Sequence, residues 1–188
     1  MKAAPALLAW LLAAACAPAA AQTVVPAGSE IRFVSKQMGV PVEGRFERWQ
    51  AELQFDPAQP QAARVAITID TRSIAFGAAE TEAEAAKPAW FDSARFAQAQ
   101  FRASGVKALG AGRYEVAGSL TLKGQTRELQ LPVTLAAGPA PGQATASGSF
   151  TLKRMDFKLG EGEWADLSVV ANEVQVRFKL LLAGVKLP

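Results

Sequence analysis

Apolar residues recur at every second position along most of this chain. The pattern is clearest from Arg113 to Leu135, on both sides of a Lys-Gly turn. A period of two predicts β-strands that bury one face and expose the other. Eight segments show it, and their inward phases run over Ile31–Ser35, Ala51–Phe55, Val65–Ile69, Phe101–Ala103, Tyr114–Leu122, Leu129–Leu135, Ala144–Leu152 and Val174–Leu182.

A sheet with one apolar face and one polar face is typical of antiparallel strands. About eight such strands, mostly joined by short turns, favour an all-β sandwich or a closed barrel, and the period alone does not choose between them. Pro132 interrupts one strand. Because proline has no N–H to donate, we expect that strand at an edge, or with that position facing outward.

One segment, "AAETEAEAAKPAWF", breaks the alternation and is rich in Ala and Glu. It predicts a short helix over roughly residues 80–87. Thr81 and Glu84 have the spacing of a capping box, which would start the helix. Pro88 would end it, because the residue before a proline disfavours helical geometry.

The first 21 residues read as a secretory signal peptide. A basic start precedes the apolar run "ALLAWLLAAACA", and Ala19-Ala20-Ala21 fits a cleavage site before Gln22. A less favoured alternative takes Cys16 as the lipidated residue of a lipoprotein signal. We therefore expect a signal peptide over 1–21, one β-domain over 22–188 and a periplasmic location, since no later run is long and apolar enough for a membrane helix.

The composition excludes much common chemistry. The chain has no histidine, and its single cysteine, Cys16, lies in the predicted signal peptide. This removes the usual triads and most zinc sites. Without Lys2 the mature chain has 19 basic and 17 acidic side chains, and these are scattered rather than gathered into a nucleic-acid stripe. We expect no cofactor, no metal and no nucleic-acid partner.

Two polar clusters remain. Glu161, Glu163 and Asp166 lie in "GEGEWADLS", which we interpret as a solvated loop rather than a catalytic or calcium site. Arg154 and Asp156 continue the inward phase of the strand before them. They would form either a polar pair that holds a ligand headgroup or an ion pair that stabilises the strand end, and the sequence leaves both alternatives open.

Small residues share the inward phase with large ones, as at Gly118, Ala144, Ala146 and Gly148. Small residues that face a barrel interior leave a gap, and a gap costs stability unless something fills it. An apolar ligand would fill it.

Five segments in order resemble the YceI-like family of polyisoprenoid-binding, lipocalin-like secreted bacterial proteins. They cover about residues 29–182 and read "SEIRFVSKQMGVPVEGRFERWQAELQFDP", "VAITIDTRSIAFG", "PAWFDSARFAQAQFRASGV", "YEVAGSLTLKGQTRELQLPVTL" and "LKRMDFKLGEGEWAD". The chain departs from the family at two places. Gln37 or Met38 stands where many members have a histidine, and Phe96-Ala97 stands where many have Tyr-Pro.

The resemblance implies an eight-stranded antiparallel lipocalin-like β-barrel, with one short helix after the third or fourth strand that closes one end. It also implies an apolar tunnel for a long isoprenoid chain of the prenyl-quinone or polyprenyl-phosphate type, with no cofactor and no catalytic residue. An eight-stranded barrel is wide enough for one slim ligand.

We therefore expect a secreted lipid-binding protein and not an enzyme. Arg154, Asp156 and Lys123 are the headgroup candidates. The residues expected to line the tunnel are Phe33, Phe46, Phe55, Ile67, Ile69, Phe101, Leu120, Leu122, Phe150 and Phe178.

The competing hypotheses are a hydrolase or isomerase that uses the acidic loop on a bound lipid, and a structural or stress-response barrel without ligand. The sequence leaves open the lipid's identity, transient contact with a membrane or a membrane redox protein, and a homodimer.

Overall fold

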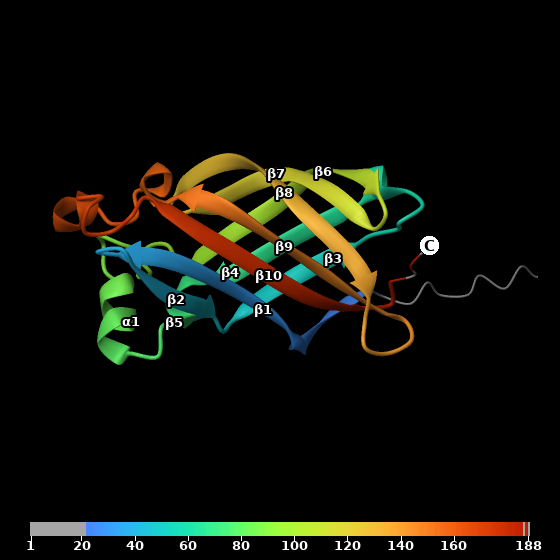
Figure 1. Ribbon diagram of the computed structural model, residues 1–188, viewed down its shortest axis with the longest axis horizontal. Coiled ribbons are helices and arrows are strands. Elements are labelled where there is room, and N and C mark those ends of the chain that lie inside the picture. Colours follow the sequence, from blue (N-terminus) through green and yellow to red (C-terminus); the bar gives the residue numbers. More distant parts are fainter. Residues whose placement is uncertain (1–21, 186, 188) are drawn as a thin grey trace, which may run out of the picture.

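Ten antiparallel strands form one sheet that curls into an open barrel (Figure 1). The computed structural model describes residues 22–185 and 187. The strand order across the sheet is β3-β4-β6-β7-β8-β9-β10-β1-β2-β5. The strands are β1 (Thr23–Gln37), β2 (Val40–Phe46), β3 (Trp49–Gln54), β4 (Arg64–Asp70), β5 (Ile74–Ala75), β6 (Gln98–Gly110), β7 (Arg113–Leu122), β8 (Gln125–Ala137), β9 (Gln143–Lys153) and β10 (Glu173–Ala183).

The all-β lipocalin-like class is confirmed, but the predicted count of eight strands is wrong. Each of the eight predicted segments coincides with a strand, except that Phe55 lies just after the end of β3, and β2 and β5 are additional. β2 was not predicted because it contains Pro41 and Gly44, two residue types that are unfavourable in strands. Two-residue β5 is too short to show any period. The predicted signal peptide, with Cys16, lies outside the described residues.

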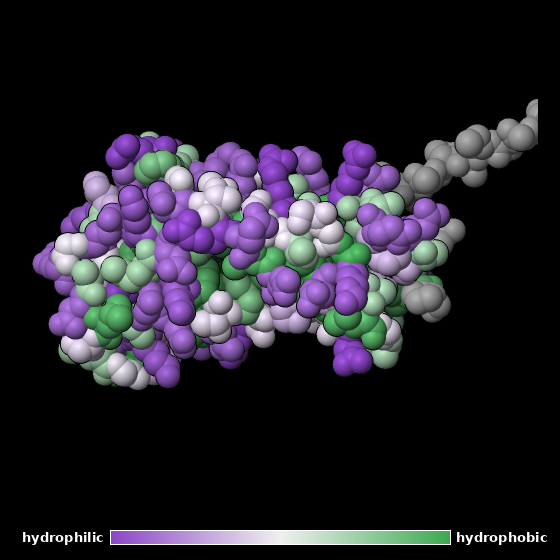
Figure 2. All heavy atoms as spheres, turned by 90° about the horizontal axis from the view of Figure 1, so that it is seen from above, coloured by the Kyte–Doolittle hydropathy of each residue, from purple (hydrophilic) through white to green (hydrophobic). Residues whose placement is uncertain are grey.

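The sheet consists of two five-stranded halves. The half β3-β4-β6-β7-β8 joins the half β9-β10-β1-β2-β5 through only four residue pairs, which run from Thr134↔Ser147 to Ala137↔Ala144. Pro132 lies just beyond this short ladder and still pairs with β7. β8 is not an edge strand, because it pairs with both β7 and β9. Pro132 is exposed and has no partner on β9, which agrees with the alternative that this position faces outward. Seen from above, apolar residues are visible along the middle of one face, between polar residues (Figure 2).

The other side of the barrel is closed by side chains rather than by a ladder. The Gln22 amide donates to the Phe55 carbonyl at 2.5 Å and accepts the Phe55 N–H at 2.6 Å. Between this contact and the start of β3, an outer cleft of about 580 Å³ separates β1 and β2 from β3. The two halves therefore meet along two incompletely paired seams.

The helix α1 (Ala79–Ala85) covers one end of the barrel (Figure 1). The predicted capping box is wrong. The helix starts after Ala78, so that Thr81 lies inside it and the N-cap has no side-chain hydrogen bond. Glu82, in the first turn, ties the preceding loop to the start of the helix instead. Its carboxylate accepts the N–H groups of Phe76 at 3.0 Å and Gly77 at 3.1 Å.

Candidate functional site

Two apolar cavities lie end to end inside the barrel. Cavity 1, near α1, has a volume of about 180 Å³, and cavity 2, toward the other end, has about 160 Å³. Both are lined by a shared waist of five residues, which are Ile31, Ile69, Leu120, Phe150 and Val176. The interior is therefore hollow along much of its length, as a tunnel requires.

All ten residues predicted to line the tunnel lie on a cavity wall. Phe33, Phe46 and Leu122 line cavity 1, and the waist residues Ile69, Leu120 and Phe150 line both. The remaining four line cavity 2 and are Phe55, Ile67, Phe101 and Phe178. That these side chains contact a ligand stays a prediction.

Three phenylalanines lie against glycines of neighbouring strands. A methyl group added at Gly118 would lie 2.6 Å from the Phe101 ring, and one at Gly148 would lie 2.5 Å from the Phe178 ring. Gly44 is covered by the Phe33 ring in the same way. The inward glycines Gly118 and Gly148 thus do not leave gaps, because the rings of Phe101 and Phe178 occupy the space beside them. Ala146, by contrast, lines cavity 2.

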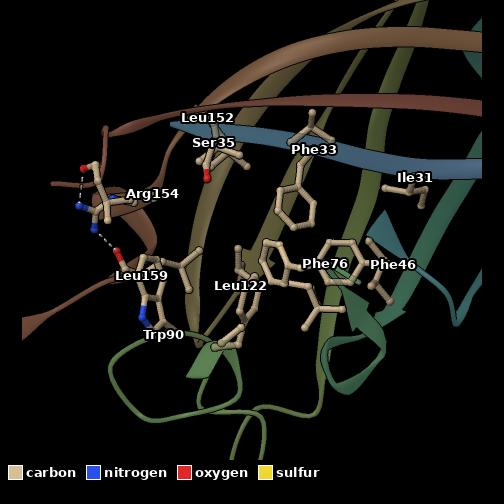
Figure 3. Close-up of a pocket in the computed structure, with 18 of the residues that line it drawn as sticks. Ile31, Phe33, Ser35, Phe46, Phe76, Trp90, Leu122, Leu152, Arg154 and Leu159 are labelled. Atoms are coloured by element: carbon tan, nitrogen blue, oxygen red, sulfur yellow. Dashed lines mark hydrogen bonds between the residues drawn. The ribbon is translucent and has the colours of Figure 1, made fainter. Parts of the chain in front are cut away.

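Cavity 2 is almost wholly apolar, and Glu52 at edge strand β3 is the one ionisable carboxylate on its described wall. The surface of cavity 1 is almost as apolar, but residues that carry polar groups lie at its end next to α1. Ser35 and Gln37 from β1, Thr81 and Glu84 from α1, and Trp164 form what we call its polar end. Figure 3 shows the apolar part of this wall, with Phe33, Phe46 and Phe76 close together.

Arg154 lies at the end of cavity 1 and is 1% exposed. Its inward direction agrees with the sequence prediction, but of the two alternatives left open, the ion pair with Asp156 does not form. Five backbone carbonyls accept its guanidinium N–H groups at 2.7–3.1 Å, and these belong to Leu159, Gly160, Trp164, Val170 and Ala171. Figure 3 shows Arg154 beside Leu159.

A guanidinium has five N–H groups, so Arg154 has none left for a headgroup. Burial lowers its pKa from the ordinary arginine value, since the charged form loses hydration. Its side chain instead holds the irregular segment 154–171 against the end of the barrel.

The other two headgroup candidates, unlike Arg154, do not line the cavity. Asp156 is exposed, because β9 ends at Lys153 and the chain turns into a 3₁₀ helix (Arg154–Phe157) that breaks the inward phase. Lys123 is only 7% exposed, and its ammonium donates to the Lys158 carbonyl at 2.7 Å and to Glu161 at 2.9 Å. The inward direction predicted for Asp156 is therefore wrong, and Lys123 is held by protein groups.

The acidic loop does not converge on the cavity. Glu161 pairs with Lys123, and Asp166 accepts hydrogen bonds from the hydroxyl and N–H of Ser168 at 2.7 and 2.8 Å. These two bonds lower the pKa of Asp166 below its ordinary value. Within the described residues, no three His, Cys, Asp or Glu side chains gather as a metal site would require. The geometry agrees with a solvated loop.

Among residues 22–185 no helix has the length and apolar character needed to cross a membrane.

A family model described as the YceI-like domain matches residues 22–182. The chain belongs to the YceI-like family. A UPF0312 protein of Shewanella baltica is 30% identical over 189 residues, which cover 96% of each chain. A UPF0312 protein of Vibrio cholerae is 29% identical over 157 residues, 79% of this chain and 83% of that protein.

Solved structures agree with this YceI-like fold. The crystal structure of Burkholderia cenocepacia BcnA has a TM-score of 0.81 and 39% identity, and the match covers 85% of this chain and 99% of that one. A polyisoprenoid binding domain from Saccharophagus degradans has a TM-score of 0.65 and 20% identity, with 87% and 98% covered. At this lower identity the likeness concerns the fold alone.

The two departures from the YceI-like pattern have different surroundings. Of Gln37 and Met38, the two candidates for the first departure, Gln37 lies in the polar end of cavity 1 and Met38 is not on its wall. Phe96 packs beside Gly124 in the β7–β8 turn, and Arg95 lies 5.3 Å above its ring. The second departure therefore concerns packing outside the two cavities.

Sequence reasoning missed several wall residues. Ile31 and Ser35 share the phase of Phe33, so the period of two was sufficient to find them. Trp90, Phe91 and Trp164 lie in irregular segments, where no period indicates direction. Only the folded chain places them on the wall.

Proposed function

We propose that this protein binds a long-chain isoprenoid lipid in the two joined cavities and carries it through an aqueous compartment. The observation that carries this proposal is the pair of apolar cavities with a common waist. Together their volumes reach the lower end of the roughly 300–1,000 Å³ typical of small-molecule sites. An end-to-end arrangement suits a slim, extended chain better than a compact ligand.

Apolar burial supplies enough free energy for such a ligand. Each buried CH₂ contributes about 0.8 kcal/mol, so a five-carbon prenyl unit contributes about 3–4 kcal/mol. Several units exceed the association cost of about 4–15 kcal/mol. Affinity should therefore follow chain length more than headgroup chemistry.

We further propose a ligand of the prenyl-quinone or polyprenyl-phosphate type. The engagement of Arg154 and Lys123 by protein groups favours the quinone type, because no described cation in cavity 1 is free to neutralise a phosphate. We propose a binding protein rather than an enzyme, secreted to the periplasm by residues 1–21, in transient contact with the membrane from which its lipid comes.

The first test is organic extraction of the purified protein, followed by mass spectrometry. We expect a prenyl lipid to co-purify, or a prenyl quinone to bind stoichiometrically when added. A protein that yields no such lipid and takes up no added prenyl quinone contradicts the proposal.

Leu120→Trp places an indole in the waist that both cavities share, and should abolish uptake with modest loss of stability. Ser119→Trp is the matched control, since its side chain points to the opposite face of β7. Lipid uptake that survives in Leu120→Trp would place the ligand elsewhere.

A further inference from the structure

We propose that one end of the molecule carries a docking surface for an uncharged or zwitterionic lipid bilayer, beside the polar end of cavity 1. This inference rests on the proposed function, because it concerns how lipid reaches the cavity. The surface consists of Met38, Val40 and Leu167, which we call the apolar tip.

The apolar tip gathers most of the large apolar side chains exposed to water. Met38 is 77% exposed, Val40 64% and Leu167 53%, and only Leu109 and Leu187 join them among the described residues. Leu109 is in β6, near the β6–β7 turn, and this turn lies at the opposite end of the barrel from α1 (Figure 1). Scattered exposed apolar residues are ordinary, but three on adjoining loops form a patch.

Met38 occupies a backbone position that disfavours it. Met38 and Gly39 form the two-residue turn between β1 and β2, with φ of 47° and 80°. Turns with both central φ values positive favour Asn-Gly or Asp-Gly, because side chains other than those of Asn, Asp and Gly are strained there. A long apolar side chain at this site is thus both strained and exposed, and the stability of the fold alone does not explain it.

Hydrogen bonds join the two loops of the apolar tip beside cavity 1. The Met38 N–H donates to the Val169 carbonyl at 2.8 Å, and the Ala171 N–H donates to the Lys36 carbonyl at 2.9 Å. Exposed Gln37, next to Met38, lines the polar end of cavity 1, as does Trp164 on the second loop. Cavity 1 therefore ends beside these two loops, at the exposed residue Gln37.

The size and charge of this surface indicate its partner. Three side chains offer far less area than the roughly 800 Å² per partner that a stable protein interface buries. Shallow insertion into a bilayer needs no such area and gives weak, reversible binding. The flanking segments carry more acidic than basic side chains: Asp156, Glu161, Glu163 and Asp166 against Arg154 and Lys158 on one, and Glu80, Glu82 and Glu84 against Lys87 on the other, while exposed Lys36 precedes the turn. We therefore expect no attraction to anionic lipids.

Flotation with phosphatidylcholine vesicles tests the proposal. Wild-type protein should bind, equally well at low and high salt, and no better when phosphatidylglycerol is added. Met38→Asn should weaken binding about threefold or more, and Met38→Asn with Leu167→Ser about tenfold. Met38→Asn should also raise the unfolding midpoint, because asparagine suits the turn better than methionine. Stability and vesicle binding would then change in opposite directions.

Leu109→Asn is the matched control, since it removes an exposed leucine (47% exposed) from the opposite end, and it should leave vesicle binding unchanged. An equal loss in Leu109→Asn, or binding that requires phosphatidylglycerol, would overturn the docking surface. Farnesol uptake from solution separates the two proposals. Uptake without vesicle binding overturns the docking surface alone, whereas loss of both overturns the proposed function and this inference with it.

Discussion

Strands supply nearly all of the wall of cavity 2, whereas a helix and irregular segments supply much of the wall of cavity 1. The wall of cavity 2 comes from β1, β3, β4 and β6–β10, with Phe55 directly after β3. Cavity 1 adds residues of α1, the Trp90–Phe91 segment and the loop from Arg154 to Val170. Most ionisable and hydrogen-bonding side chains on the two walls belong to cavity 1, where Ser35 and Gln37 lie on β1, Thr81 and Glu84 on α1, and Arg154 and Trp164 on the loop.

The difference shows how one barrel can hold the apolar tail of a lipid at one end and its headgroup at the other. A strand alternates strictly, so an inward face can be entirely apolar, as in cavity 2. Loops and helix ends carry polar backbone groups that need hydrogen-bond partners. Arg154 donates to five such carbonyls at once. We infer that cavity 2 holds the apolar tail and that the polar end of cavity 1 is where a headgroup would lie.

Arg154→Met should have the largest effect, because it leaves five buried carbonyls without a donor. We expect the free energy of unfolding to fall by about 3–5 kcal/mol in urea denaturation. Prenol affinity per folded molecule should change little, since cavity 2 is untouched. Arg177→Met, at an exposed site on β10, is the control. Lost affinity with unchanged stability would instead make Arg154 a headgroup ligand.

Filling each cavity separately should sharpen the distinction between tail and head ends. Ala146→Phe narrows cavity 2, and Ala85→Phe narrows cavity 1 from the helix. Each should cost about 1–3 kcal/mol of stability. In a series of prenols of increasing length, Ala146→Phe should weaken the long chains by tenfold or more and spare the short ones. If both variants weaken all lengths equally, the two cavities do not differ as proposed.

Gly44→Ala tests whether a glycine keeps its cavity open. The added methyl group would overlap the Phe33 ring, so this ring, which lines cavity 1, must shift. Stability should fall by about 1 kcal/mol, with weaker binding of ligands that reach cavity 1. Adding Phe33→Leu should restore both, since the smaller side chain leaves room. A double variant as impaired as the single one would refute this account.

The smallest effect concerns acid, at the end of β4 beside cavity 1. Asp70 accepts the Arg72 N–H and pairs with Arg48, and these contacts lower its pKa below the ordinary value. Because the folded pKa is lowered, its stabilisation is present above the unfolded pKa and is lost as pH falls through the folded pKa. Asp70→Asn should cost at most about 1 kcal/mol at pH 7, and this difference should disappear in acid. The measurement is the urea midpoint of both proteins from pH 7 into acid. A stability difference between them that persists in acid would contradict the prediction.

Much of the site was predictable because it is made of strands. Phe101 and Phe178 point inward by phase alone, and the fold class follows from the same period. The period of two no longer predicted side-chain direction beyond the end of the strand. Arg154 and Asp156 are two residues apart, yet the 3₁₀ turn after Lys153 buries the first and exposes the second. The turn needs partners from residues 159–172, which a local pattern does not reveal.

The sequence by itself determined that the chain forms antiparallel strands with an apolar interior, because alternation in a strand places every second side chain on one face. Only the tertiary structure decided which polar groups are free, since Arg154, Lys123 and Glu82 all find their partners through folding. It also decided where the rings of Phe33, Phe101 and Phe178 lie, because each occupies the space beside a glycine of the neighbouring strand. Hydrogen bonding and packing depend on distances between segments far apart in the chain, and no local pattern contains those distances.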